Sequence, residues 1–176
     1  MVIYCMSDIH GELDKFERML DLIHFSDEDH LYILGDVIDR GALGVDILRR
    51  IMEESNMTML LGNHEQMCLS TLGTHNEFGA RDLWRMNGGS STYRELLYHR
   101  THQERNEILH FLSDLPDHLE LTVGEQKFHL VHGRPQIRVS WSAPGHPCTK
   151  WNFCSPTVNS KWSGRSERKC RISLRS

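Results

Sequence analysis

The fold is decided by the stretch HLYILGDVIDRG at residues 30–41. Its apolar half, HLYIL, ends at a Gly-Asp pair, which is typical of a buried strand that gives way to a loop. Two other apolar runs end in a similar manner, VIYCM at residues 2–6 before Ser7-Asp8 and MTMLL at residues 57–61 before Gly62-Asn63. The three runs predict three buried strands.

Helices are predicted between these strands. Apolar residues recur at helical spacing over residues 12–23, and a second helix is expected over residues 43–54. Strands that alternate with helices pair in parallel, with the helices packed on the faces of the sheet. We therefore predict an α/β domain in which helices flank a β-sheet.

The remainder of the first 133 residues is predicted to complete this domain. Residues 65–116 are expected to be mainly helical, with a break at Asn87-Gly88-Gly89. Two short runs at residues 119–123 and 127–131 predict a β-hairpin that ends at His132-Gly133.

The composition changes near residue 133. Residues 1–133 hold 11 Lys and Arg against 23 Asp and Glu, whereas residues 134–176 hold 9 against 1. The second segment also contains three of the four tryptophans and three of the five cysteines, and it shows no helical or strand period. We interpret residues 1–133 as the core domain and residues 134–176 as a basic, Ser-, Trp- and Cys-containing tail. The tail either binds an anionic partner, is disordered, or is not the natural continuation of the domain.

Several classes of protein are excluded by the sequence. No stretch approaches the roughly 18 apolar residues of a membrane span, and the first residues contain no basic region of a signal peptide. Five cysteines without a CxxC pair indicate neither a disulfide framework nor a zinc knuckle. We therefore expect a cytoplasmic protein without a membrane partner. The acidic core domain also argues against nucleic acid as a partner.

Polar side chains follow each predicted strand at the point where it ends. In an open α/β sheet, ligands bind beyond the carboxyl ends of the strands because the loops converge there. Carboxylate and imidazole groups without thiolates suit manganese, iron or zinc better than calcium, and two such ions can act together on a phosphoryl group. The residues concerned are Asp8, His10, Asp36, Asp39, Arg40, Asn63, His64 and His132.

Each of these residues also has an ordinary structural interpretation. Asp8 could cap the following helix, and Asp36 and Asp39 could form turns beside glycines. Glu65 is interpreted as a cap or support for the helix that follows it. Independent turn residues need not supply metal-binding groups at every strand end, so we favour the metal site.

The order and spacing of four motifs identify the family that this chain resembles. The motifs are DIHG at residues 8–11, GDVIDRG at 35–41, GNHE at 62–65 and HG at 132–133, and together they resemble the calcineurin-like metallophosphoesterases. The Asp-Arg-Gly ending of the second motif resembles the phosphoprotein phosphatase branch, which includes bacterial and phage serine/threonine phosphatases and diadenosine tetraphosphate hydrolases. The stretch WRMNGG at residues 84–89, with Thr92 after it, resembles the helical region of the bacterial members.

The resemblance implies a metallophosphoesterase sandwich with a mixed β-sheet, and two divalent metal ions as cofactors. Manganese is favoured, with iron or zinc as alternatives. Arg40 would bind the phosphate, His64 would be the general acid, and Asp39 would orient it. A hydroxide that bridges the metals would be the nucleophile. The implied metal ligands are Asp8 and His10 for the first ion, Asp36 for both, and Asn63 and His132 for the second.

The implied function is hydrolysis of phosphomonoesters in a phosphoprotein or a small phosphorylated substrate, as performed by a serine/threonine protein phosphatase. The alternatives are a dinucleoside tetraphosphate hydrolase and an inactive fragment that acts only as a binding module. Members of the family continue past the motif at His132 with further strands and another histidine, and the later histidine here is His146. We therefore expect incomplete C-terminal strands and an incomplete second metal site.

Overall fold

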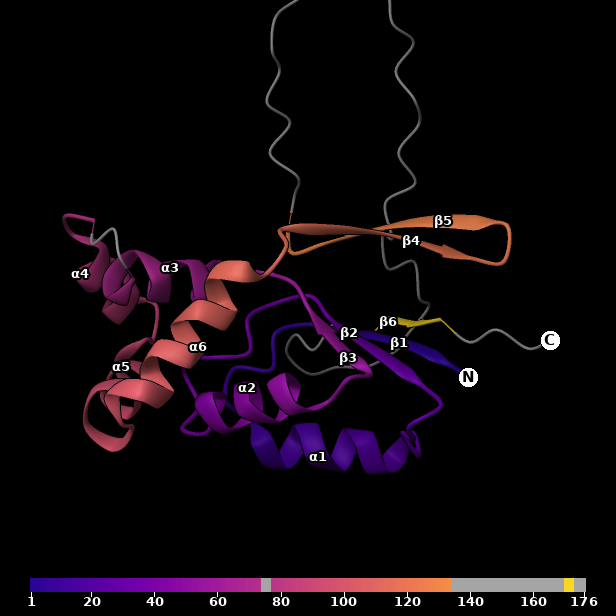
Figure 1. Ribbon diagram of the computed structural model, residues 1–176, viewed down its shortest axis with the longest axis horizontal. Helices are drawn as coiled ribbons and strands as arrows, with labels where there is room; N and C mark the ends of the chain where they lie inside the picture. Colours follow the sequence, from indigo (N-terminus) through magenta and orange to yellow (C-terminus); the bar gives the residue numbers. More distant parts are fainter. Residues whose placement is uncertain (74–76, 134–169, 173–176) are drawn as a thin grey trace, which may run out of the picture.

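The computed structural model describes residues 1–73, 77–133 and the backbone of residues 170–172 (Figure 1). Its main sheet has the strand order β3-β2-β1-β6. The predicted strands are present as β1 (Ile3–Met6), β2 (His30–Ile33) and β3 (Met57–Met59). β1 pairs in parallel with β2, and β2 pairs in parallel with β3. The prediction of three parallel strands is therefore confirmed.

The fourth strand comes from the C-terminal segment. β6 (Cys170–Ile172) pairs antiparallel with β1, so that Cys170 lies opposite Cys5 in the register. The sequence predicted no strand in this segment, and that prediction is wrong for residues 170–172. A strand of three residues is too short to show an alternating pattern. The rest of the predicted tail, residues 134–169 and 173–176, lies outside the described residues.

Two helices cover one face of this sheet, as Figure 1 shows below the strands. They are α1 (Leu13–Leu22) and α2 (Gly44–Glu53). Phe16 and Leu20 lie one helical turn apart in α1, and both are buried in the same core as Leu31 of β2. Full burial of one such side chain contributes about 1.5–3 kcal/mol, so the apolar stripe accounts for the docking of α1.

The predicted helical region forms a group of helices beside the sheet (Figure 1). The break at residues 87–89 separates α4 from α5, as predicted. Gly89 is required there because a Cβ at this position would lie 2.3 Å from ring atoms of Trp84. The elements are α3 (Asn63–Leu72), α4 (Ala80–Met86), α5 (Ser90–Arg94), the π-helical turn η1 (Glu95–His99) and α6 (His102–Asp114).

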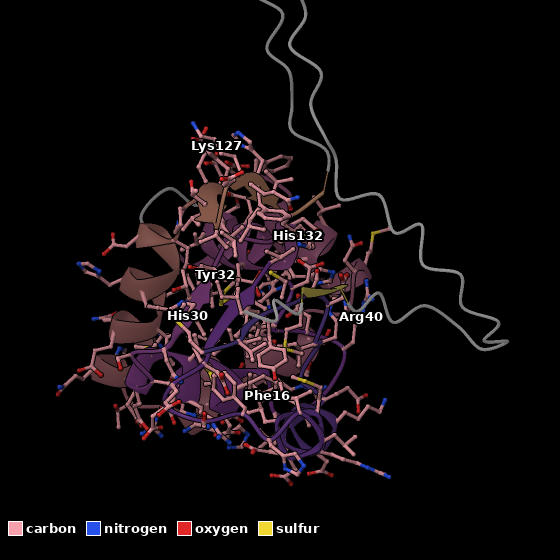
Figure 2. All side chains as sticks on the ribbon, turned by 90° about the vertical axis from the view of Figure 1, so that its right-hand side faces the viewer. Phe16, His30, Tyr32, Arg40, Lys127 and His132 are labelled. Atoms are coloured by element: carbon pink, nitrogen blue, oxygen red, sulfur yellow. The ribbon has the colours of Figure 1, made fainter. Side chains whose placement is uncertain are left out.

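The predicted hairpin forms a separate two-stranded sheet of β4 (His118–Val123) and β5 (Gln126–Val131). Leu130 of β5 packs with Leu60 and Cys5, and Figure 1 shows the hairpin on the opposite side of the main sheet from α1 and α2. Figure 2 shows Lys127 at the outer end of the hairpin and His132 nearer the sheet. The arrangement confirms the predicted α/β class with helices flanking a mixed sheet. No helix in the described residues is long and apolar enough to cross a membrane.

Candidate metal centre

The loops that follow β1 and β2 are joined by backbone hydrogen bonds. The amide of His10 donates to the carbonyl of Asp36 (3.0 Å), and the amide of Gly41 donates to the carbonyl of His10 (2.9 Å). A Cβ on Gly41 would lie 2.5 Å from that same carbonyl oxygen, so only glycine allows this approach. The contact holds two of the predicted motifs side by side.

The backbone is strained where these loops meet. Six non-glycine residues in the described chain have a positive φ, and five of them belong to the predicted site. Left-handed backbone costs an L-residue roughly 1–2 kcal/mol, so it persists only where the surroundings enforce it. Such clustering is typical of functional loops. The five residues are Asp8 (φ 59°), His10 (50°), Asp36 (57°), Asp39 (72°) and Arg40 (65°).

The first predicted metal group contains a buried nitrogen that nothing satisfies. His10 Nδ1 lies 3.1 Å from the carbonyl oxygen of Ile38, to which it donates as the N–H tautomer. His10 Nε2 then carries a lone pair, and this atom has no hydrogen-bond partner in the described part of the chain. It faces a carboxylate oxygen of Asp8 at 3.8 Å and one of Asp36 at 3.9 Å. Burial lowers the pKa of His10, which favours the neutral ring that a metal requires.

The second predicted group contains three electron-rich atoms that converge. His132 Nδ1 lies 2.5 Å from the carbonyl oxygen of Leu34, while its Nε2 lies 3.0 Å from Asn63 Oδ1 and 3.3 Å from Asp36 Oδ1. The hydrogen bond with Asp36 raises the pKa of His132, and this effect outweighs burial of the ring. Without a metal, an imidazolium can satisfy the two oxygens. A cation at the same place would satisfy all three atoms, so the donor set fits a divalent ion.

Asp36 lies between the two groups. Its Oδ2 faces His10 and its Oδ1 faces His132, and Oδ1 also accepts a hydrogen bond from the backbone amide of His64 (3.0 Å). Burial alone would raise the pKa of Asp36, but the hydrogen bonds from His132 and His64 outweigh it and lower the pKa. The carboxylate is therefore ionised and placed to serve both groups.

Asp39, Arg40 and His64 form a cluster beside these groups. His64 Nδ1 lies 2.6 Å from Asp39 Oδ2, and both side chains are buried. His64 Nε2 lies 3.3 Å from Arg40 Nη2. Because a guanidinium can only donate, His64 Nε2 accepts from Arg40 in this arrangement and His64 Nδ1 donates to Asp39.

His10, Asp36 and His64 form another possible metal-binding group. Each offers one ligand atom, and these three atoms all lie within 4.8 Å of one another. A third histidine ligand is thus possible on distance alone. Both ring nitrogens of His64, however, contact Asp39 and Arg40. These contacts favour a role for His64 beside the metal groups rather than in them.

Asp8 does not cap the helix that follows it, which was its alternative interpretation. α1 begins at Leu13 with Glu12 as its N-cap and without a side-chain cap hydrogen bond. The Asp8 side chain is about half exposed, and it accepts a hydrogen bond from the neighbouring Ser7 hydroxyl at 2.5 Å. All eight predicted site residues lie in the loops or first turns at the sheet edge, whereas His146 lies outside the described residues.

Comparison with known proteins matches residues 1–158 to the model of one family, described as calcineurin-like phosphoesterase. The chain belongs to this family. The calcineurin-like phosphoesterases use divalent metal ions, in agreement with the donor groups above.

Relatives of two kinds share this phosphoesterase core. Serine/threonine-protein phosphatase 2 of Escherichia coli is 32% identical over 131 residues, which are 74% of this chain and 57% of the relative. A symmetrical bis(5'-nucleosyl)-tetraphosphatase of Delftia acidovorans is 46% identical over 67 residues, which are 37% of this chain and 24% of the relative. The crystal structure of a metallophosphoesterase from Sphaerobacter thermophilus is 23% identical, with a TM-score of 0.46, over 72% of this chain and 45% of that one. The chain thus spans between a quarter and somewhat more than half of these proteins.

Two residues that position Asp39 within this phosphoesterase core were not assigned a role from the sequence. Trp84 Nε1 donates to Asp39 Oδ2 (2.6 Å), the same oxygen that His64 contacts, and the Asp39 amide donates to Thr92 Oγ1 (3.0 Å). Both residues belong to the quoted stretch around residues 84–92. The N–H of a buried tryptophan usually needs a hydrogen-bond acceptor, and this requirement was the one feature of the sequence that could have indicated a partner for Trp84.

Glu65 also does more than the sequence indicated. It caps the start of α3, where its Oε2 accepts from the amide of the N-cap residue Gly62 (3.1 Å). The same carboxylate accepts hydrogen bonds from three successive amides in the loop after β2: Asp36 (2.8 Å), Val37 (2.9 Å) and Ile38 (3.2 Å). This buried side chain therefore joins the second and third motifs of the family.

We expect the substitution Glu65→Gln to destabilise the protein by about 2–4 kcal/mol, because the amide NH₂ would oppose backbone donors and leave buried N–H groups unsatisfied. Urea unfolding of the full chain measures this change. Glu28→Gln, at an exposed position, is the matched control and should unfold as the wild type does. Equal stability of the two variants would show that Glu65 does not hold the loops together.

Proposed function

We propose that this chain is a metal-dependent phosphomonoester hydrolase that acts as a serine/threonine protein phosphatase. The observation that carries the proposal is the position of Asp36 between two groups of metal-binding atoms, with Arg40, His64 and Asp39 beside them. Similarity to a protein named serine/threonine-protein phosphatase 2 over 74% of this chain supports the choice of substrate.

The proposed metal ligands are Asp8, His10, Asp36, Asn63 and His132, and the proposed ions are two of manganese, with iron or zinc as alternatives. Bound divalent ions would polarise the phosphoryl group and supply an activated water as the nucleophile. Aspartate, asparagine and histidine side chains can hold such ions without any thiolate.

Arg40 is proposed to bind the phosphate. Its planar guanidinium can donate to two phosphate oxygens at once, which the point charge of a lysine cannot copy. Its backbone is held by the bond from its amide to the Gly88 carbonyl (3.1 Å), so the side chain starts from a defined position.

His64 is proposed to protonate the leaving alkoxide. For this role it must carry a proton on Nε2, so Arg40 would have to turn its guanidinium from Nε2 to the phosphate, while Asp39 Oδ2, 2.6 Å from Nδ1, orients the ring. Trp84 and Thr92 hold Asp39 in place, so they support the orientation of the acid.

A dinucleoside tetraphosphate hydrolase is the second candidate. Similarity to the tetraphosphatase of Delftia acidovorans at 46% identity supports it, over a shorter stretch of 67 residues. The same ligand set and acid would then act on a phosphoanhydride.

The two candidates are separated by measuring release of phosphate from a phosphoserine peptide and hydrolysis of diadenosine tetraphosphate, each with added Mn²⁺. We expect the peptide to be the better substrate in kcat/KM. Cleavage of the dinucleotide alone would contradict the protein phosphatase proposal and favour the second candidate. Absence of turnover on either substrate by folded protein would favour the inactive fragment.

A further inference from the structure

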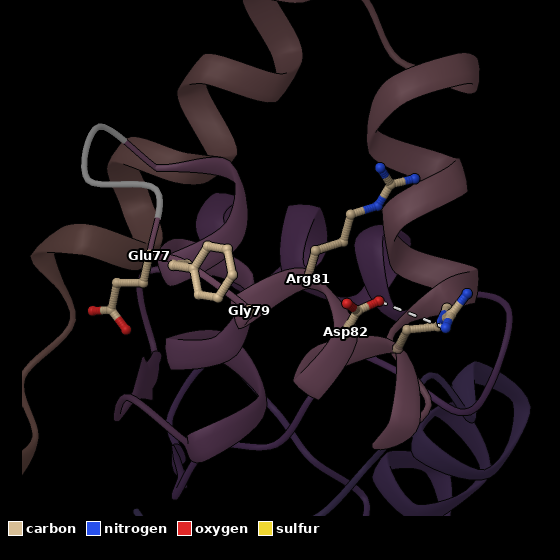
Figure 3. Close-up of a pocket in the computed structure, with 6 residues that line it drawn as sticks. Glu77, Gly79, Arg81 and Asp82 are labelled. Atoms are coloured by element: carbon tan, nitrogen blue, oxygen red, sulfur yellow. Dashed lines mark ion pairs between the residues drawn. The ribbon is translucent and has the colours of Figure 1, made fainter.

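A hollow lined by arginine and aromatic side chains lies at α4, α5 and η1. Its volume is about 330 Å³, and its lining includes Arg81, Trp84, Arg85, Tyr93, Arg94 and Tyr98. A second hollow of about 580 Å³ shares Arg81 and Arg85 with it. Figure 3 shows Arg81 extending from α4 in that second hollow, with the ion pair of Asp82 and Arg85 next to it.

The charge of the arginine hollow contrasts with that of the core domain. Residues 1–133 carry 11 Lys and Arg against 23 Asp and Glu, yet three of those 11 cations line this one hollow. Elsewhere Arg50 pairs with Glu17, and Arg100 pairs with both Asp46 and Glu95. The hollow is therefore a local positive site on an acidic domain.

Two of its arginines form no ion pair with a carboxylate in the described part of the chain. The guanidinium of Arg81 lies 4.6 Å from the centre of the Tyr93 ring, and Arg94 Nε donates to the Ser90 carbonyl (3.2 Å). Among the residues that the structure describes, neither side chain forms an ion pair with Asp or Glu, whereas Arg85 pairs with Asp82 at 3.6 Å. Arg81 and Arg94 thus keep donors available for an anion.

The wall of the arginine hollow is connected to the candidate metal centre. Trp84 lines the hollow, and its indole N–H donates to Asp39. The carbonyl of Gly88, next to the lining residue Gly89, accepts from the amide of Arg40. Two hydrogen bonds therefore link the wall of the hollow to Asp39 and to Arg40, the residues proposed to orient the acid and to bind the phosphate.

We propose that the arginine hollow binds a second anionic group, a carboxylate or a phosphate, carried by the same phosphopeptide whose phosphoserine is hydrolysed. This inference rests on the proposed function and adds a preference for acidic substrates to it. The paired donors of each guanidinium match carboxylate and phosphate oxygens. The exposed Tyr98, 71% accessible, offers a surface for the peptide chain beside them.

A nucleotide fits the same hollow less well. Stacking of a base needs open aromatic faces, but Tyr93 is covered by Arg81, and Trp84 is only 1% accessible. Tyr98 alone would have to hold the base. The lining therefore favours an acidic peptide over a nucleoside phosphate.

The test is a binding measurement on the full chain in EDTA, where no turnover is expected. Fluorescence anisotropy would compare two labelled phosphoserine peptides that differ only in having acidic or neutral flanking residues. We expect the wild type to bind the acidic peptide about tenfold more tightly, the change that one well-formed charged contact produces. The double variant Arg81→Gln/Arg94→Gln should remove this difference, whereas Arg18→Gln, an exposed arginine of α1, should keep it.

Equal affinity of the wild type for the two peptides would overturn the inference, as would a preference that survives in the double variant. Tighter binding of diadenosine tetraphosphate that depends on the same two arginines would instead assign the hollow to a nucleotide. Failure of the proposed function gives a different pattern: the affinity difference is present, but neither peptide loses phosphate when Mn²⁺ is added.

Discussion

Replacing Asp36 by Asn is expected to reduce metal-dependent hydrolysis of para-nitrophenyl phosphate by about 10³-fold or more. The Asp36 carboxylate contacts both candidate metal groups, through Oδ2 toward His10 and Oδ1 toward His132. An asparagine would remove the negative charge of the carboxylate and would turn an amide N–H donor toward one of the two metal groups. Loss of several kcal/mol of metal-derived stabilisation corresponds to a fall of this size.

The control for Asp36→Asn is Asp14→Asn, which makes the same change at an exposed position of α1. It should keep the turnover of the wild type. Circular dichroism of both variants would show that the chain is folded. Turnover that persists in Asp36→Asn would contradict the proposed position of Asp36 between two ions.

Replacing His64 by Ala is expected to reduce turnover of a phosphoserine peptide by about 10²–10⁴-fold, the usual contribution of a general acid. An alkoxide is a poor leaving group near neutral pH and needs the proton, whereas an aryl oxide needs it much less. Turnover of para-nitrophenyl phosphate should therefore fall much less. The measurement is kcat for both substrates in the wild type and the variant.

His110→Ala is the matched control, because His110 is exposed on α6 and pairs with Asp114 at 2.9 Å, away from Asp39. Its kcat on both substrates should equal that of the wild type. An equal loss on alkyl and aryl substrates in His64→Ala would argue against the role of His64 as the acid. It would favour instead the other geometric possibility, in which His64 joins His10 and Asp36 as a metal ligand.

The strands and the residues that follow them could be predicted because their signals are local. Each of the three parallel strands is an apolar run that ends in a small or polar residue, and parallel pairing brings those ends to one edge. The same argument predicts that Asp8, Asp36 and Asn63 lie near one another. The hairpin was predicted in a similar way, and with it the position of His132.

The contacts that hold the site together could not be predicted, because they join residues far apart in the sequence. Glu65 binds amides 27 to 29 residues away, and Trp84 binds Asp39 across 45 residues. Composition and periodicity contain no information on such pairs. The left-handed backbone of Asp8 and His10 is likewise set by contacts between loops and leaves no pattern in the sequence.

The most direct test of the account is a calorimetric titration of Mn²⁺ into the full chain after its metals have been removed with EDTA. We predict two ions per chain, the second bound more weakly because its ligand set is expected to be incomplete, with the first lost in His10→Ala, the second lost in Asn63→Ala, and both weakened in Asp36→Asn. Binding of no ion by folded wild-type protein, or unchanged binding in all three variants, would contradict the assignment of these side chains as the metal centre.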